Sequence, residues 1–136
     1  MADAVTSQTL YDAVGSKHAI MKFTNISDGS GEASVKKVDV SALESDPMTG
    51  AACDGVTIES VTFSNFGMSV KLLWDASTDV LALHLPQDYA DTLDFSDGGL
   101  KNNSGSGKTG DIMLTTVGHA SGDAYTVTLT MIKNYA

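Results

Sequence analysis

The residues with the most recognisable chemistry lie at positions 105–109, whose sequence GSGKT has the form of the end of a phosphate-binding loop. Such a loop cradles phosphates with backbone N–H groups, follows a strand, opens a helix and begins with a further glycine. Asn102 occupies the position of that glycine here. Residues 110–114 continue as a strand-like segment rather than a helix. We therefore expect no nucleotide binding and interpret Lys108 as a solvated lysine in a flexible loop.

The three histidines and the single cysteine have no spacing that predicts a metal site or a catalytic dyad. His18, His84 and His119 are far apart in the chain, and Cys53 is distant from each of them. A zinc site needs several such ligands together, and a reactive thiolate needs a cation or a histidine beside it. We interpret Cys53 as a small buried apolar residue, and a lone cysteine cannot form an intramolecular disulfide.

Two acidic stretches offer oxygen ligands to a cation: Asp28 with Glu32, and Asp94 with Asp97. Neither has the alternating acidic positions and the twelfth-position glutamate of an EF-hand. A calcium site at a sandwich edge stays open, while turn chemistry is the simpler explanation of these residues. A glycosidase would also need a cleft lined by aromatic residues, but Trp74 is the only tryptophan and is expected in the core. The sequence thus predicts no catalytic residue, no metal ligand and no cofactor.

The charge balance excludes further classes of partner. The 136 residues include 17 acidic side chains and 8 basic ones, all lysine, which gives a net charge of −9. Arginine is the usual reader of phosphate and guanine, and an acidic surface repels nucleic acid and anionic lipid. No apolar run approaches the roughly 20 residues that span a bilayer, and the first residues lack a secretory signal. We expect a soluble protein that is used in the cytosol where it is synthesised or is assembled there, with no nucleic-acid or membrane partner.

Period-2 alternation dominates the chain, and helical periodicity is nearly absent. Residues 125–131 alternate four apolar side chains with three threonines, the pattern of a strand with one buried face. Further strands are expected at residues 20–26, 35–40, 56–63, 68–75, 80–85, 93–95 and 112–117. Short strands separated by Gly, Asp and Ser turns are typical of an antiparallel sandwich. We predict an all-β, jelly-roll-like sandwich of about seven or eight strands, with less than about a fifth of the residues in helix.

The inward positions of these strands define a predicted core: Phe23, Val70, Leu72, Trp74, Leu83, Leu114, Val127 and Leu129. On the strand at residues 80–85, Leu81, Leu83 and Leu85 are expected on one face and His84 on the other. The only helical turns we expect lie in residues 7–14 or 48–53.

Two segments fall outside this pattern. Residues 15–136 are expected to form a single domain, preceded by an N-terminal arm of residues 1–14. The arm's apolar points are Val5, Leu10 and Tyr11, too few to fold alone, and we predict that these three side chains anchor it to a neighbouring chain. The second segment, residues 97–110, is rich in Gly, Ser and Asn and is expected to be a surface excursion or a contact loop.

Most of the chain resembles the small virion structural proteins of marine tailed bacteriophages. The similarity lies in residues 19–32 and 37–43, and again in residues 99–107, 109–116 and 118–119. It is a likeness of overall sequence texture and carries no catalytic motif. The resemblance implies a non-enzymatic protein of a phage particle, assembled in the host cytoplasm. Its role would be capsid decoration or cement, with a neck or tail component as the alternative. Its implied partners are further copies of itself, the major capsid protein, or both.

A binding module is the competing hypothesis from another class. It would be a β-sandwich that recognises a carbohydrate or a receptor and so serves host adsorption, although the aromatic content of only 7% disfavours a lectin. Ordered binding of an oligosaccharide favours that module, whereas ordering of the arm on a particle favours the structural protein.

Overall fold

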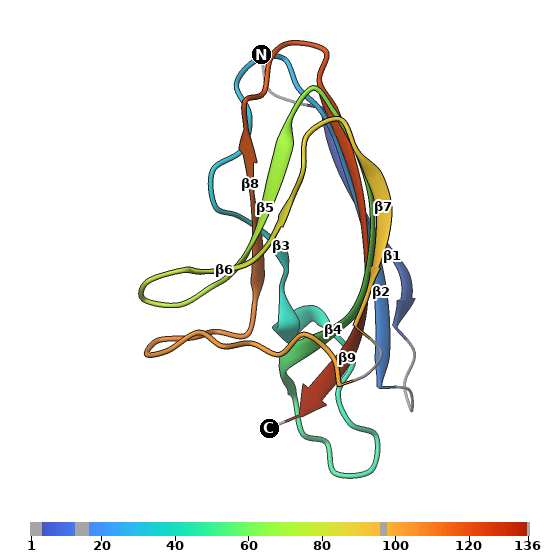
Figure 1. Cartoon of the computed structure of the whole chain (residues 1–136). Coiled ribbons are helices and arrows are strands. Elements are labelled where there is room, and N and C mark those ends of the chain that lie inside the picture. Colours follow the sequence, from blue (N-terminus) through green and yellow to red (C-terminus); the bar gives the residue numbers. More distant parts are fainter. Residues whose placement is uncertain (1–3, 13–16, 96–97, 136) are drawn as a thin grey trace.

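The protein is an all-β antiparallel sandwich (Figure 1). The computed structural model describes residues 4–12, 17–95 and 98–135. A five-stranded sheet has the order β1-β2-β9-β4-β7, and a four-stranded sheet has the order β3-β8-β5-β6. The strands are β1 (Ala4–Asp12), β2 (His18–Ile26), β3 (Val35–Val38), β4 (Cys53–Phe66), β5 (Ser69–Trp74), β6 (Val80–Leu85), β7 (Ala90–Asp94), β8 (Ile112–Val117) and β9 (Ala124–Tyr135).

The expected fold class is confirmed, while the jelly-roll connectivity stays a prediction. All eight expected strands are present as β2 to β9, and β1 lies within the expected arm. The described residues contain no α-helix, only a 3₁₀ turn, η1 (Val40–Ala42), and among them no helix is long and apolar enough to cross a membrane. The helical turn expected in residues 7–14 is wrong over residues 7–12, because Ser7 and its neighbours pair with β2. Around residues 48–53 the structure has a hydrogen-bonded turn rather than a helix: the Gly50 N–H donates to the Asp46 carbonyl (2.8 Å), and Cys53 begins β4.

The core lies between the inner faces of the two sheets. Phe23 of β2 is opposite Val127 of β9, which is in turn opposite Phe63 of β4, and all three are buried. Seven of the eight predicted core residues are buried: Phe23, Val70, Leu72, Trp74, Leu114, Val127 and Leu129. The eighth, Leu83, is partly buried and packs against this cluster. Alternation of side chains between two faces therefore locates the core.

Strand β6 departs from the predicted alternation. Leu72 of β5 is opposite Leu83, but the next residue of β5 is opposite Leu81, so Ala82 is an extra residue in β6. An extra residue of this kind shifts the side chains beyond it by one face. Leu81 is consequently 49% exposed, and the expectation that it shares the inner face of Leu83 and Leu85 is wrong. Val80 and Ala82 pack against the core instead.

Candidate functional site

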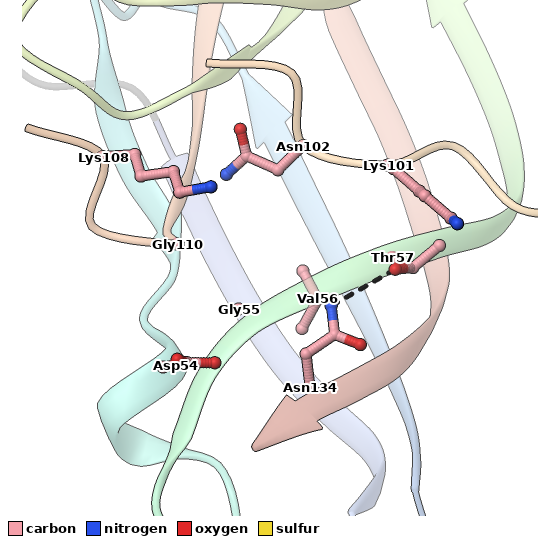
Figure 2. A pocket seen from close by; sticks show the side chains of 9 residues that line it. All are labelled: Asp54, Gly55, Val56, Thr57, Lys101, Asn102, Lys108, Gly110 and Asn134. Carbon is pink, nitrogen blue, oxygen red and sulfur yellow. Dashed lines mark hydrogen bonds between the residues drawn. The ribbon is translucent and has the colours of Figure 1, made fainter. Parts of the chain in front are cut away.

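A polar groove lined by two lysines and an aspartate lies at one end of the sandwich (Figure 2). Its cavity has a volume of about 410 Å³. Three parts of the chain supply the walls: the start of β4, the loop at residues 98–110 and the end of β9. The lining residues are Asp54, Gly55, Val56, Thr57, Lys101, Asn102, Lys108, Gly110 and Asn134.

Backbone hydrogen bonds hold the loop at residues 98–110 in place over β4. Leu100 forms an antiparallel bridge with Ile58, with N···O distances of 2.8 and 3.0 Å. At the other end, Thr109 donates from its backbone N–H to the Asp75 carbonyl (3.1 Å) and from its hydroxyl to the Asp75 carboxylate (2.8 Å). Gly110 has a φ of +87°, and a Cβ there would lie 2.1 Å from the Asp54 carbonyl oxygen. Only glycine therefore lets the loop approach β4 this closely.

The groove lining combines two ammonium groups and two amides with one carboxylate, that of Asp54, and one hydroxyl, that of Thr57. Lys101 and Lys108 are exposed and form no ion pair with any other described residue. Figure 2 shows the Lys108 side chain directed toward Asn102, with Lys101 at the opposite end near Thr57. The Asn134 amide donates to the Thr57 hydroxyl (3.2 Å). Such a lining can hold a polar or anionic group, because ammonium and amide N–H groups are hydrogen-bond donors.

The resemblance of residues 105–109 to a phosphate-binding loop does not extend to the surrounding structure. Thr109 is followed by β8 rather than a helix, as the sequence predicts, so no helix N-terminus faces the loop. The Thr109 hydroxyl, which in a phosphate-binding loop would face a metal ion, instead donates to Asp75.

The histidines and the cysteine lie in separate places. The Nε2 atom of His18 is 3.5 Å from Glu59, His84 hydrogen-bonds Ser69 (3.1 Å) and His119 hydrogen-bonds Thr116 (3.1 Å). No three His, Cys, Asp or Glu residues within the described ranges form a group that could hold a metal ion. Cys53 is buried, as expected, and that burial raises the pKa of its thiol.

The acidic residue Glu32, considered above as a cation ligand, has other partners. Its carboxylate is 2.6 Å from the Lys37 ammonium, and both side chains are buried. The same carboxylate accepts hydrogen bonds from the Tyr125 hydroxyl (2.5 Å) and the Asn25 amide (2.8 Å). Because these three donors surround it, Glu32 ties the loop after β2 to β9. Asp97, the partner considered for Asp94, lies outside the described residues.

The three predicted partner-binding residues lie together on β1, the outermost strand of the five-stranded sheet (Figure 1). Val5, Leu10 and Tyr11 are 40%, 48% and 44% exposed. Strand β1 pairs with β2 from Ala4 to Asp12, with a register irregularity at Leu10. Its other edge is free of any described strand. The sequence prediction placed these residues on an arm, whereas the structure places them on an exposed sheet edge.

A buried ion pair, not foreseen from the sequence, fixes the C-terminal end of β1. The Lys133 ammonium is 2.6 Å from the Asp12 carboxylate, and the two side chains are 0% and 9% exposed. Asp12 also accepts the backbone N–H of Glu44 (2.9 Å). Burial acts to lower the pKa of Lys133, but the hydrogen bond and charge of Asp12, together with Tyr135, outweigh it and raise that pKa. Strand β1 is thereby tied to β9 across β2.

No family model, curated protein or solved structure matches the chain. The polar groove and the free edge of β1 are two surface features that can contact a ligand or a partner.

Proposed function

We propose that this protein is a non-enzymatic structural component of a tailed-phage particle, a capsid decoration or cement protein that attaches to its neighbours through β1. The proposal combines the sequence resemblance with one structural observation that carries it. That observation is a free sheet edge, Ala4 to Tyr11, with no charged residue and with exposed apolar side chains.

A free edge strand is suited to protein attachment. It presents a row of backbone N–H and C=O groups that a strand from another chain can pair with. Val5, Leu10 and Tyr11 add apolar contacts beside that row. The buried Asp12–Lys133 pair holds the strand in place before it meets a partner, which lowers the entropy lost on binding.

Removal of β1 residues tests the proposal. Deletion of residues 1–10 takes away Val5 and Leu10 but keeps Asp12, so Lys133 retains its buried partner. We expect the truncated protein to fold yet to lose most of its co-sedimentation with phage particles that lack the protein. The variant Met48→Ser is the matched control, because Met48 is an apolar side chain that is 89% exposed away from β1. Equal binding by truncated and full-length protein would refute the attachment role.

The polar groove supports a second candidate, the carbohydrate- or receptor-binding module. Its volume and its unpaired lysines suit a saccharide that carries an anionic group. If the full-length protein binds no particle but binds a defined glycan, and Lys101→Gln with Lys108→Gln abolishes that binding, this candidate replaces the first. A neck or tail component is the third, distinguished by its position on the particle.

A further inference from the structure

We infer that β1 pairs antiparallel with β1 of a second copy of this chain, which joins two five-stranded sheets into one continuous sheet. The inference rests on the assembly role proposed above and names one partner for it. It follows from three properties of β1: its unprotected edge, its lack of charge and a side-chain pattern that matches itself.

Strand β1 is the least protected edge in the sandwich. Natural edge strands avoid pairing by being short, charged or irregular. The other edge of the larger sheet, β7, has five residues and carries Asp91 and Asp94. In the smaller sheet, β3 has four residues, two of them lysines, and β6 has six residues with the irregularity at Ala82. Strand β1 has nine residues, and none from Ala4 to Tyr11 is charged.

The distribution of charge favours contact between copies at this edge. Each chain has a net charge of −9, so most surfaces of two copies repel each other. Asp12, the one charged residue of the described strand, is already paired with Lys133. Two copies can therefore bring their β1 edges together without placing like charges opposite each other.

The register with β2 shows which side chains of β1 share a face. Thr6 and Gln8 are opposite Thr24 and Lys22, whereas Ser7 is opposite the buried Phe23. Residues directly opposite in an antiparallel pair point to the same face. A two-fold axis normal to the sheet keeps every side chain on its own face. Two β1 strands related by such an axis can therefore pair only in registers in which one residue is opposite the same residue of the second copy.

We place that axis at Ser7, the middle residue of Ala4 to Leu10. Thr6 of one copy is then opposite Gln8 of the other, which gives a hydrogen-bonding pair on the outer face. Val5 is opposite Thr9 on the inner face, and Ala4 reaches Leu10 at either end. Val5 and Leu10 thus each meet an uncharged side chain of the second copy.

Sedimentation velocity of Ser7→Lys against Ser45→Lys tests the pairing. Both serines are exposed, and both substitutions change the net charge by the same amount, but Ser45 lies outside β1. We expect wild type and Ser45→Lys to sediment as dimers at protein concentrations up to about 0.5 mM, where even a weak pair is populated. Ser7→Lys should sediment as a monomer with an unchanged melting temperature, because it places two lysines opposite each other.

A cysteine at the axis tests the register. Residues directly opposite have Cα atoms about 4.5–5.5 Å apart, within the range of a disulfide. We expect Ser7→Cys to form a dimer disulfide under mild oxidation, while Ser45→Cys and the wild type with its buried Cys53 do not. A monomeric wild type, or a dimer that Ser7→Lys leaves intact, would overturn the inference.

These outcomes are separable from those of the proposed function. A monomeric wild type that still needs residues 1–10 to bind particles would refute the self-pairing and leave the attachment role standing, with the shell as partner. A Ser7-dependent dimer that binds no particle would refute the attachment role and leave the self-pairing standing.

Discussion

At the residue scale, the buried pair of Lys133 and Asp12 determines how firmly β1 belongs to the sandwich. Lys133 is at an inward position of β9, in the same alternation as Leu129 and Met131. A charged side chain on a buried face requires a partner, since transferring an unpaired charge from water into the core is strongly unfavourable. The sequence therefore held a signal for this pair, a lysine in phase with apolar residues. Spacing could not identify Asp12 as the partner, because the two residues are 121 positions apart.

The substitution Asp12→Asn leaves Lys133 buried without a counter-charge. We expect it to lower the free energy of unfolding by about 3–5 kcal/mol, the usual cost of removing one partner of a buried pair. Urea unfolding followed by tryptophan fluorescence measures the change. Asp91→Asn, on an exposed carboxylate of β7, should change stability by less than about 0.5 kcal/mol. The double variant Asp12→Leu, Lys133→Met should recover most of the loss; an Asp12→Asn protein as stable as wild type would contradict the structural role of the pair.

The burial of Cys53 predicts how the stability of the protein depends on pH and how fast its thiol reacts. Burial raises the pKa of the thiol in the folded protein above that in the unfolded chain. The buried, protonated thiol therefore contributes its full stability below the unfolded thiol pKa of about 8.5. That contribution is lost as pH rises through the pKa of the folded thiol. The native protein should therefore react slowly with a disulfide reagent at pH 8, and the urea-unfolded protein should react fast. Equal rates in the two states would show that the thiol is accessible.

At the element scale, alternation predicted the strands well because sheets impose a strict period of two on buried side chains. The prediction failed where an extra residue interrupts the two-residue alternation and where a strand has no buried face. The extra residue Ala82 moves Leu81 outward, and nothing in the local sequence marks that position. Strand β1 was missed for the other reason, because residues 4–11 are exposed on both faces and so carry no burial pattern. Likewise, the groove depends on Gly110 and on hydrogen bonds between distant loops, which spacing does not show.

Two leucine truncations test these assignments of strand faces. Leu129→Ala, at a position that is 0% exposed, should lower the free energy of unfolding by about 2–5 kcal/mol, since core truncations leave a cavity. Leu81→Ala, at a position that is 49% exposed, should cost less than about 0.5 kcal/mol. Both values come from the same urea unfolding experiment. A loss for Leu81→Ala as large as that for Leu129→Ala would show that β6 has no shift of face.

At the scale of the whole molecule, the sandwich combines an acidic surface with one uncharged edge. Because copies of the same net charge repel each other in solution, they associate most readily through surfaces without charged side chains. An acidic surface with one uncharged edge suits a subunit that is made in many copies and then placed on a particle. On the particle, each contact raises the effective concentration for the next contact. The polar groove lies at the end of β9 and at the start of β4, away from the free edge of β1, so the two features can be tested separately.

The most direct test of the assembly role is an electron-microscopy map of the phage particle at a resolution that separates strands. We expect the sandwich at regularly repeated positions on the shell, with the Ala4–Tyr11 edge of each copy paired to a strand of a neighbouring chain. Particles on which the protein is absent, or on which β1 faces solvent in every copy, would contradict the proposal.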